Sequence, residues 1–350
     1  MANRLLRSPQ YITQTASGNT IKSVQLVIEI PNGTVRYTLI KDASNGTVST
    51  FEWAELARDY LNLDIADYPP SFPYYIAGLD IELNLSFWNN VNPSASGATQ
   101  VGSTYTESHK GFDGYGVFMQ GANPSLTADT AAISNYSQTT GGTKSYTQYK
   151  PKNYGGTIPN INASGQMFYN TVGFNATSET LDSGQVVTVD RIPCNKFSTD
   201  GNDKGYSITS QRGVQVIFIN KYGAFQEEFF MFKFVEEIKS KRESFQSNII
   251  ASNGTYSTDD HSIQDFDISA NKSYTVSSGF LPEYYNEVFT EMLLSEKVWV
   301  TLRDFYTNTF KETPVNIKTN NFTYKNYLNE KLIEFSFTFD ISFNYINNIR

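Results

Sequence analysis

The feature that most constrains the fold of this chain is a regular alternation of apolar and polar residues. The stretches 24–30 and 79–87 alternate in this way. So does a stretch near the C-terminus, whose apolar members are Ile333, Phe335, Phe337, Phe339, Ile341 and Phe343. Because successive side chains of a strand point to opposite faces, the pattern predicts strands with one buried and one solvated face. Strands of this kind are typical of antiparallel sheets.

Further strands are predicted in the C-terminal part of the chain. The stretch 214–234 holds two apolar runs around Tyr222-Gly223-Ala224, which predicts a strand, a turn and a second strand. Strands are also predicted at 297–302 and 314–324. The aromatic content of 15%, carried by 25 Phe and 23 Tyr, favours β structure in addition.

Two segments show helical periodicity instead. In 50–61 one helical face is apolar, and Ser49 with Glu52 predicts a capping box at its start. In 282–295 an apolar stripe runs from Tyr285 to Leu293, and Pro282 suits the first turn. We interpret both stripes as faces that pack on a sheet.

Composition divides the chain into three predicted parts. Residues 1–88 form an N-terminal β unit with the short helix 50–61. Residues 89–190 are rich in Gly, Ser, Thr and Asn, which predicts an irregular, loop-rich insertion. Residues 191–350 form a C-terminal β-sandwich or barrel with the helix 282–295. The predicted fold class is mainly β: antiparallel β-sandwich or barrel modules with one or two flanking helices and long loop insertions.

The charge and the absence of long apolar runs limit the expected partners. A net charge of −8 repels nucleic acid, so we expect no sequence-specific nucleic-acid binding. No stretch approaches the ~20 apolar residues of a membrane span, and no signal segment is visible. A single cysteine, Cys194, cannot form an internal disulfide, which favours synthesis in a cytoplasm.

Residue types that often carry catalysis are sparse. His109 and His261 stand in polar contexts and are interpreted as solvated loop histidines, and Cys194 has no base beside it. The segment 200–205 is similar to a calcium loop, but Gln211 stands where the bidentate Glu is required. We therefore predict no catalytic residue, no cofactor and no metal site.

Adjacent carboxylates leave one enzymatic hypothesis open. A glycosidase needs two carboxylates at a suitable separation, and the chain has many. Glu227 and Glu228 are neighbours, however, and neighbours in a strand point to opposite faces. This argues against their acting as one catalytic pair.

The order of several segments resembles a known family. These segments are Phe112 to Pro124, Asn220 to Gln226, Lys241 to Asn248, Ser278 to Asn286, Leu293 to Val298, Pro314 to Ile317 and Phe322 to Lys325. Over residues 108–124 and 215–350 the chain is similar to structural virion proteins of tailed phages of Bacteroidota, including crAss-like phages. The resemblance implies a neck-ring, tail-ring or tail-tube-like protein without catalytic residues.

The chain is therefore expected to be a non-enzymatic component of a phage virion, synthesised in the host bacterial cytoplasm. Its expected partners are copies of itself in a cyclic homo-oligomer and adjacent virion proteins, with the genome passing through the lumen. An N-terminal arm and the middle of the chain supply the predicted interface residues, which are Arg4, Arg7, Asp113, Tyr115, Phe118, Asn123 and Pro124. Deleting residues 1–10 is expected to leave the monomer folded.

Two alternatives remain open at this point. Abundant Tyr and Asn and exposed loops would also suit a carbohydrate-binding or adhesin module of a tail appendage. A polysaccharide depolymerase is the second alternative.

Overall fold

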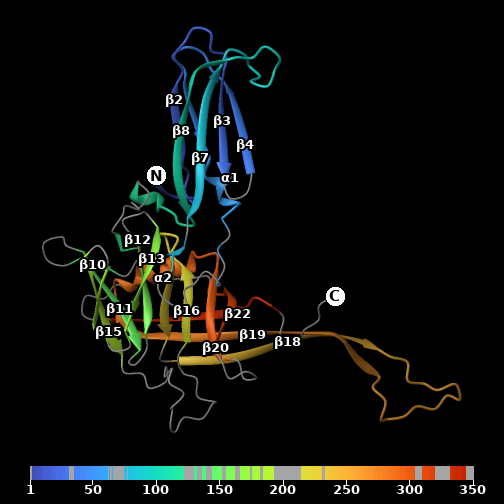
Figure 1. Ribbon diagram of the computed structural model, residues 1–350. Helices are drawn as coiled ribbons and strands as arrows, with labels where there is room; N and C mark the ends of the chain where they lie inside the picture. The colour runs from blue at the N-terminus through green and yellow to red at the C-terminus, as the bar shows by residue number, and fades with distance from the viewer. Residues whose placement is uncertain are drawn as a thin grey trace. The chain divides into compact units, whose positions relative to one another are not determined.

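The structure is a computed structural model of the chain (Figure 1). The residues it describes are 2–30, 35–61, 63, 65, 75–76, 78–121, 130–131, 136–138, 144–151, 155–161, 166–173, 176–181, 184–192, 214–230, 233–303, 310–319 and 332–343. The fold is mainly β, as the alternating patterns predicted.

The chain forms two compact units whose boundaries differ from the predicted ones. The first unit comprises Met1–Thr199, Ile217–Glu228 and Tyr284–Glu296. The second comprises Asp200–Val216, Phe229–Glu283 and Lys297–Arg350. Segments distant in sequence thus belong to one unit, which a division by composition along the chain does not detect.

The first unit begins with a five-stranded sheet in the order β1-β8-β7-β3-β4. Its strands are β1 (Ala2–Leu5), β3 (Ser23–Ile30), β4 (Val35–Asp42), β7 (Leu79–Trp88) and β8 (Gln100–Phe112). One face carries the buried rows predicted from the alternation, including Leu26, Ile28, Leu83 and Leu85. These rows pack against Phe51 of β5 (Val48–Glu52) and Trp53 just after it, and β5 pairs with β2 (Tyr11–Thr15) in a separate sheet of two strands.

The first predicted helix is shorter than the pattern indicated. It is α1 (Ala54–Arg58), and the predicted capping box is wrong because Ser49 is a buried residue of strand β5. The Glu52 carboxylate instead accepts hydrogen bonds from the backbone N–H of Ala54 at 2.8 Å and of Gln10 at 3.4 Å. The side chain therefore joins the start of the helix to the N-terminal segment.

The predicted irregular middle is instead rich in strands. A first small sheet has the order β10-β11-β15-β14 and a second the order β6-β13-β12-β9. Their strands are β6 (Tyr75–Ile76), β9 (Thr130–Ala131), β10 (Tyr136–Gln138), β11 (Lys144–Pro151), β12 (Gly156–Ile161), β13 (Met167–Val172), β14 (Ser178–Thr180) and β15 (Val186–Ile192). Ile158 and Val172 of one sheet share a core with Val187 and Val189 of the other. Short strands with many polar residues carry too little alternation to be found from the sequence.

The predicted hairpin at 214–234 and the second helix are confirmed. The hairpin is β16 (Val214–Ile219) and β17 (Phe225–Phe230), with Gly223 in its turn at a φ of 79°. The helix is α2 (Tyr285–Leu293), which is shorter than predicted. The placement of Pro282 in its first turn is wrong, because Pro282 is the last residue of strand β19 (Ile263–Pro282) and pairs with Leu332. The Glu291 carboxylate of α2 lies 3.1 Å from the Lys221 ammonium, which anchors the helix to the hairpin turn.

A seven-stranded sheet has the order β17-β16-β20-β21-β22-β19-β18. Its remaining strands are β18 (Lys233–Gln246), β19 (Ile263–Pro282), β20 (Val298–Arg303), β21 (Phe310–Ile317) and β22 (Leu332–Ile341). The aromatic row of β22 is buried as predicted, with Phe230 edge-on to Phe337 at 5.7 Å between ring centroids. This core lies in the second unit.

Candidate functional site

The most unusual feature of the second unit is an arm formed by β18 and β19 beyond the seven-stranded sheet (Figure 1). The register pairs β19 with β22 only from Ser273 onward, whereas β18 pairs with β19 along its whole length. We call residues 238–272 the arm. Over this length the described strands form a ribbon of two strands alone, closed by the bridge between Ile250 and Tyr256.

A β-bulge divides the arm. The register shifts between Lys241 and Glu243, and Asp267 on the opposite strand has a φ of 50°, in the left-handed region. A bulge bends a ribbon and changes the direction of the side chains beyond it. The distal part therefore presents its side chains differently from the part that adjoins the sheet.

The arm exposes large apolar side chains. Between 40% and 68% of the surface of each of seven such residues is exposed: Ile238, Phe245, Ile250, Tyr256, Ile263, Phe266 and Ile268. Phe245 and Phe266 contact each other across the strands, with ring centroids 5.8 Å apart. Apolar side chains this dense on a ribbon of two strands are typical of a surface that a partner covers.

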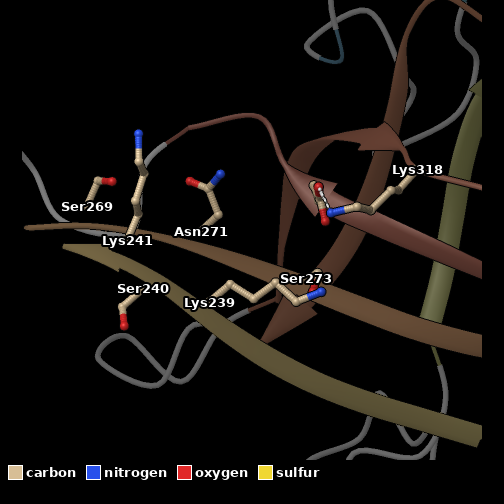
Figure 2. A pocket seen from close by; sticks show the side chains of 8 residues that line it. Lys239, Ser240, Lys241, Ser269, Asn271, Ser273 and Lys318 are labelled. Carbon is tan, nitrogen blue, oxygen red and sulfur yellow. Dashed lines mark hydrogen bonds and ion pairs between the residues drawn. The ribbon is translucent and has the colours of Figure 1, made fainter. Parts of the chain in front are cut away.

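A polar pocket of about 220 Å³ lies at the base of the arm (Figure 2). Lys239 and Lys241 enter it from β18, and Ser269 and Asn271 enter it from β19. Lys318, just after β21, completes it and forms an ion pair of 3.0 Å with Asp340 of β22. The pocket is lined by three lysines and one aspartate, so its lining is positively charged.

Several predicted interface residues lie together in the first unit. The Arg7 guanidinium stacks over the Tyr115 ring at 4.8 Å and donates a hydrogen bond of 2.9 Å to the carbonyl of Leu294. Arg58 forms an ion pair with Asp113 at 3.4 Å. Burial raises the pKa of Asp113, although the positive charges of Arg58 and Arg7 oppose the shift. These contacts join the N-terminal segment to the residues after β8 and to the end of α2.

Among the predicted interface residues that the structure describes, Phe118 has the greatest exposure. It lies in a 3-10 turn, Phe118–Gln120, and 98% of its surface is exposed, as is 92% of that of Met119. Asn123 and Pro124 lie outside the described residues. The role of these residues at an interface stays a prediction.

The expectation that the N-terminal segment is a free arm is wrong. Residues 2–5 form β1, which pairs in parallel with β8, and Leu5 and Leu6 are buried. Arg4 lies opposite Gly111 in this register, and its Nε is 3.5 Å from Nδ1 of His109. A short polar sequence can still complete a sheet when its few apolar residues reach the core.

The interpretation of His109 as a solvated loop residue is also wrong. The side chain lies on β8, is buried, and stacks on Trp53 with ring centroids 5.2 Å apart. Its Nε2 is 2.9 Å from a Glu107 oxygen, yet burial and the charge of Arg4 lower the pKa of the imidazole. His261 is exposed, as expected. Cys194 and the segment 200–205 lie outside the described residues.

No protein-family model matches the chain, and no curated protein or solved structure is significantly similar to it. In the described part of the chain, no helix is both long and apolar enough for a membrane crossing. The same residues hold no group of three His, Cys, Asp or Glu side chains placed to share a metal ion.

The carboxylates of β17 are buried rather than presented to a substrate. Glu227 forms an ion pair with Lys150 and accepts a hydrogen bond of 2.8 Å from the Thr157 N–H. Glu228 accepts one of 2.9 Å from the Gln226 side chain, and burial raises the pKa of Glu228 to about 8. Because all these groups are buried, this pair does not fit the open cleft that a glycosidase needs for a polysaccharide.

The sequence contained one signal for the arm that the alternation did not reveal. Asn253-Gly254 is a strong hairpin turn signal, and Gly254 has a φ of 78°. The flanking strands escape a search for alternation because water contacts both of their faces.

Proposed function

We propose that this chain is a non-enzymatic structural subunit that assembles with copies of itself. More specifically, we propose a component of a bacteriophage virion that forms part of a cyclic ring in the neck or tail. The single observation that carries the assembly proposal is the arm, with its exposed apolar side chains and its ribbon of two strands. The sequence resemblance carries the assignment to a virion.

Two physical arguments support assembly through the arm. An isolated ribbon of two strands is at best marginally stable in water, so its order benefits from a covering surface. Strand β18 is also at one edge of the described sheet, and an edge of 14 residues exposes unpaired backbone groups that a second chain can bind. A neighbouring subunit can satisfy both requirements at once.

A cyclic arrangement follows if the contact is head-to-tail. When the covering surface lies elsewhere on the same chain, each copy covers the arm of the next. The series closes into a ring when the rotation between neighbouring copies is a whole fraction of 360°. A ring of acidic subunits does not grip phosphate, which would allow a genome to slide through its lumen.

The test compares the full chain with a variant whose arm is shortened. Asn-Gly replaces residues 242–268, which joins Lys241 to Ser269, its partner in the register. Light scattering and negative-stain microscopy at rising concentration should show rings for the full chain and monomers for the variant. A second variant keeps the arm length and changes only Phe245, Ile263 and Phe266 to Thr. It should also remain monomeric, which would show that the apolar side chains and not the length of the arm are required.

Circular dichroism and thermal denaturation check that both variants fold. A full chain that stays monomeric at every concentration would contradict the self-assembly proposal. Rings from the shortened variant would show that the subunits meet through another surface.

A further inference from the structure

The tip and the base of the arm carry opposite charges. Residues 247–262, which we call the tip, contain Asp259 and Asp260 and no lysine or arginine. Both aspartates are exposed. The pocket at the base is lined by Lys239, Lys241 and Lys318, with Asp340 as its one acidic lining residue.

The ribbon keeps the tip away from the pocket of its own chain. Lys241 and Gln246 are five residues apart on one strand, which corresponds to roughly 17 Å at ~3.4 Å per residue. The tip begins beyond Gln246, where the Ser247 N–H donates a hydrogen bond of 2.7 Å to the Ser262 carbonyl. The strands stay paired on both sides of the bulge and the ribbon extends away from the seven-stranded sheet (Figure 1), so the tip reaches such a pocket only on another molecule.

We propose that the acidic tip of one copy docks in the lysine-lined pocket at the arm base of the next copy. This contact rests on the proposed self-assembly and deepens it, because it names both surfaces and their chemistry. The occupant is a second copy of this chain. Its Asp259 and Asp260 carboxylates bind among the ammonium groups of the three lysines. The pocket of about 220 Å³ has room for such short side chains.

The lysines can accept new partners. Lys239 lies 3.3 Å from Glu237, Lys241 lies 3.8 Å from Glu243, and half or more of each lysine side chain is exposed. Exposed ion pairs of this kind contribute little to stability, so their exchange for carboxylates of a neighbour is easy. Ser269 and Asn271 add neutral donors beside the lysines.

The contact also covers the apolar part of the arm. A tip seated on a neighbour brings two apolar residues of the tip itself, Ile250 and Tyr256, against that neighbour. Both are more than 60% exposed in the single chain. Electrostatic attraction would select the partner, and apolar burial would add affinity.

Two variants of the full chain test the contact. The tip variant carries Asp259→Lys and Asp260→Lys, and the pocket variant carries Lys239→Glu and Lys241→Glu. Each variant places like charges at the proposed contact, so each alone should need an about tenfold or higher concentration than the wild type to assemble. An equimolar mixture should assemble like the wild type, because each tip then meets a pocket of opposite charge. Sedimentation velocity measures all three samples.

The mixture excludes general charge attraction as the cause. The wild-type net charge of −8 becomes −4 in the tip variant and −12 in the pocket variant, so both remain acidic. A matched control carries Asp42→Lys and Glu55→Lys, at two exposed positions outside the arm. It should assemble alone like the wild type, and it should not restore assembly of the pocket variant.

The outcomes separate this contact from the broader proposal. If the wild type forms rings and either variant alone forms them equally well, the contact between tip and pocket is wrong and self-assembly stands. If neither variant assembles alone or in the mixture, tip and pocket are not each other's partners. A wild type that remains monomeric removes both proposals.

Discussion

At the scale of single residues, the core of the first unit contains a dense group of ionisable side chains. Lys150, Glu227 and Glu228 are each at most 4% exposed. A buried charge is tolerated when it is paired or neutralised, and both solutions occur here. Lys150 and Glu227 neutralise each other, whereas burial favours the protonated form of Glu228.

Glu228 should make stability depend on pH. Burial raises the pKa of Glu228 from 4.5 to about 8, while Gln226 and Lys150 oppose the shift. The folded chain therefore holds a proton that the unfolded chain releases between these pH values. The free energy of unfolding should fall as pH rises across this window, by up to about 1.4 kcal/mol per unit. In Glu228→Gln this contribution is absent, so denaturant titrations of the two proteins should diverge with rising pH. Parallel curves would contradict the assignment.

Lys150 should be essential for stability because its loss leaves Glu227 buried without its counter-charge. We expect Lys150→Met to lower the free energy of unfolding by about 3–5 kcal/mol. The double variant with Glu227→Gln should recover much of the loss, since the amide oxygen can still accept the Thr157 N–H. Chemical denaturation of both variants measures this. Equal stability of the wild type and Lys150→Met would contradict a structural role for the pair.

At the scale of elements, a short strand can matter as much as a long one. Strand β1 has four residues, yet it brings Leu5 and Leu6 into the core and continues the sheet beyond β8. The arm is the opposite case, because its longer strands bury little in the single chain. Length in sequence therefore does not indicate contribution to stability.

Deleting residues 1–10 should destabilise the first unit. The deletion removes two fully buried leucines, each worth about 1.5–3 kcal/mol of burial, together with the pairing of β1. Thermal denaturation should show a clearly lower midpoint than for the wild type. Tyr11→Ser, at a position that is 62% exposed, is a control that should leave the midpoint nearly unchanged. An unchanged midpoint after the deletion would restore the hypothesis that the N-terminal segment is free of the fold.

At the scale of the whole molecule, the acidic composition matters more than any single site. With a net charge of −8, the average field opposes binding to a nucleic-acid backbone. This agrees with a proposed lumen along which a genome slides. It also explains why contacts between copies would need local charge separation, as between the arm tip and its base.

The assembled protein should not retain double-stranded DNA at about 0.15 M salt, because its net charge of −8 opposes binding to the phosphate backbone. Gel retardation over a range of protein concentrations measures this, with a basic DNA-binding protein as the positive control. Saturable binding at that salt concentration would contradict the proposed lumen and would indicate a local basic surface.

The sequence by itself determined the β class, the one-sided strands of the sheets, the hairpin at 214–230 and the helix that became α2. All of these depend on local periodicity, because the side chains that define each element are close in sequence. The turn at Asn253-Gly254 was a local signal of the same kind.

Only the tertiary structure decided which residues form one unit and which surfaces remain open. The burial of His109, the place of β1 beside β8 and the pairing of Arg58 with Asp113 depend on partners distant in sequence. The arm can be recognised only in the complete sheet, because a strand exposed to solvent on both faces shows no alternation of apolar and polar residues. Periodicity reports whether a side chain is buried, whereas the partner that buries it is chosen by the packing of the whole chain.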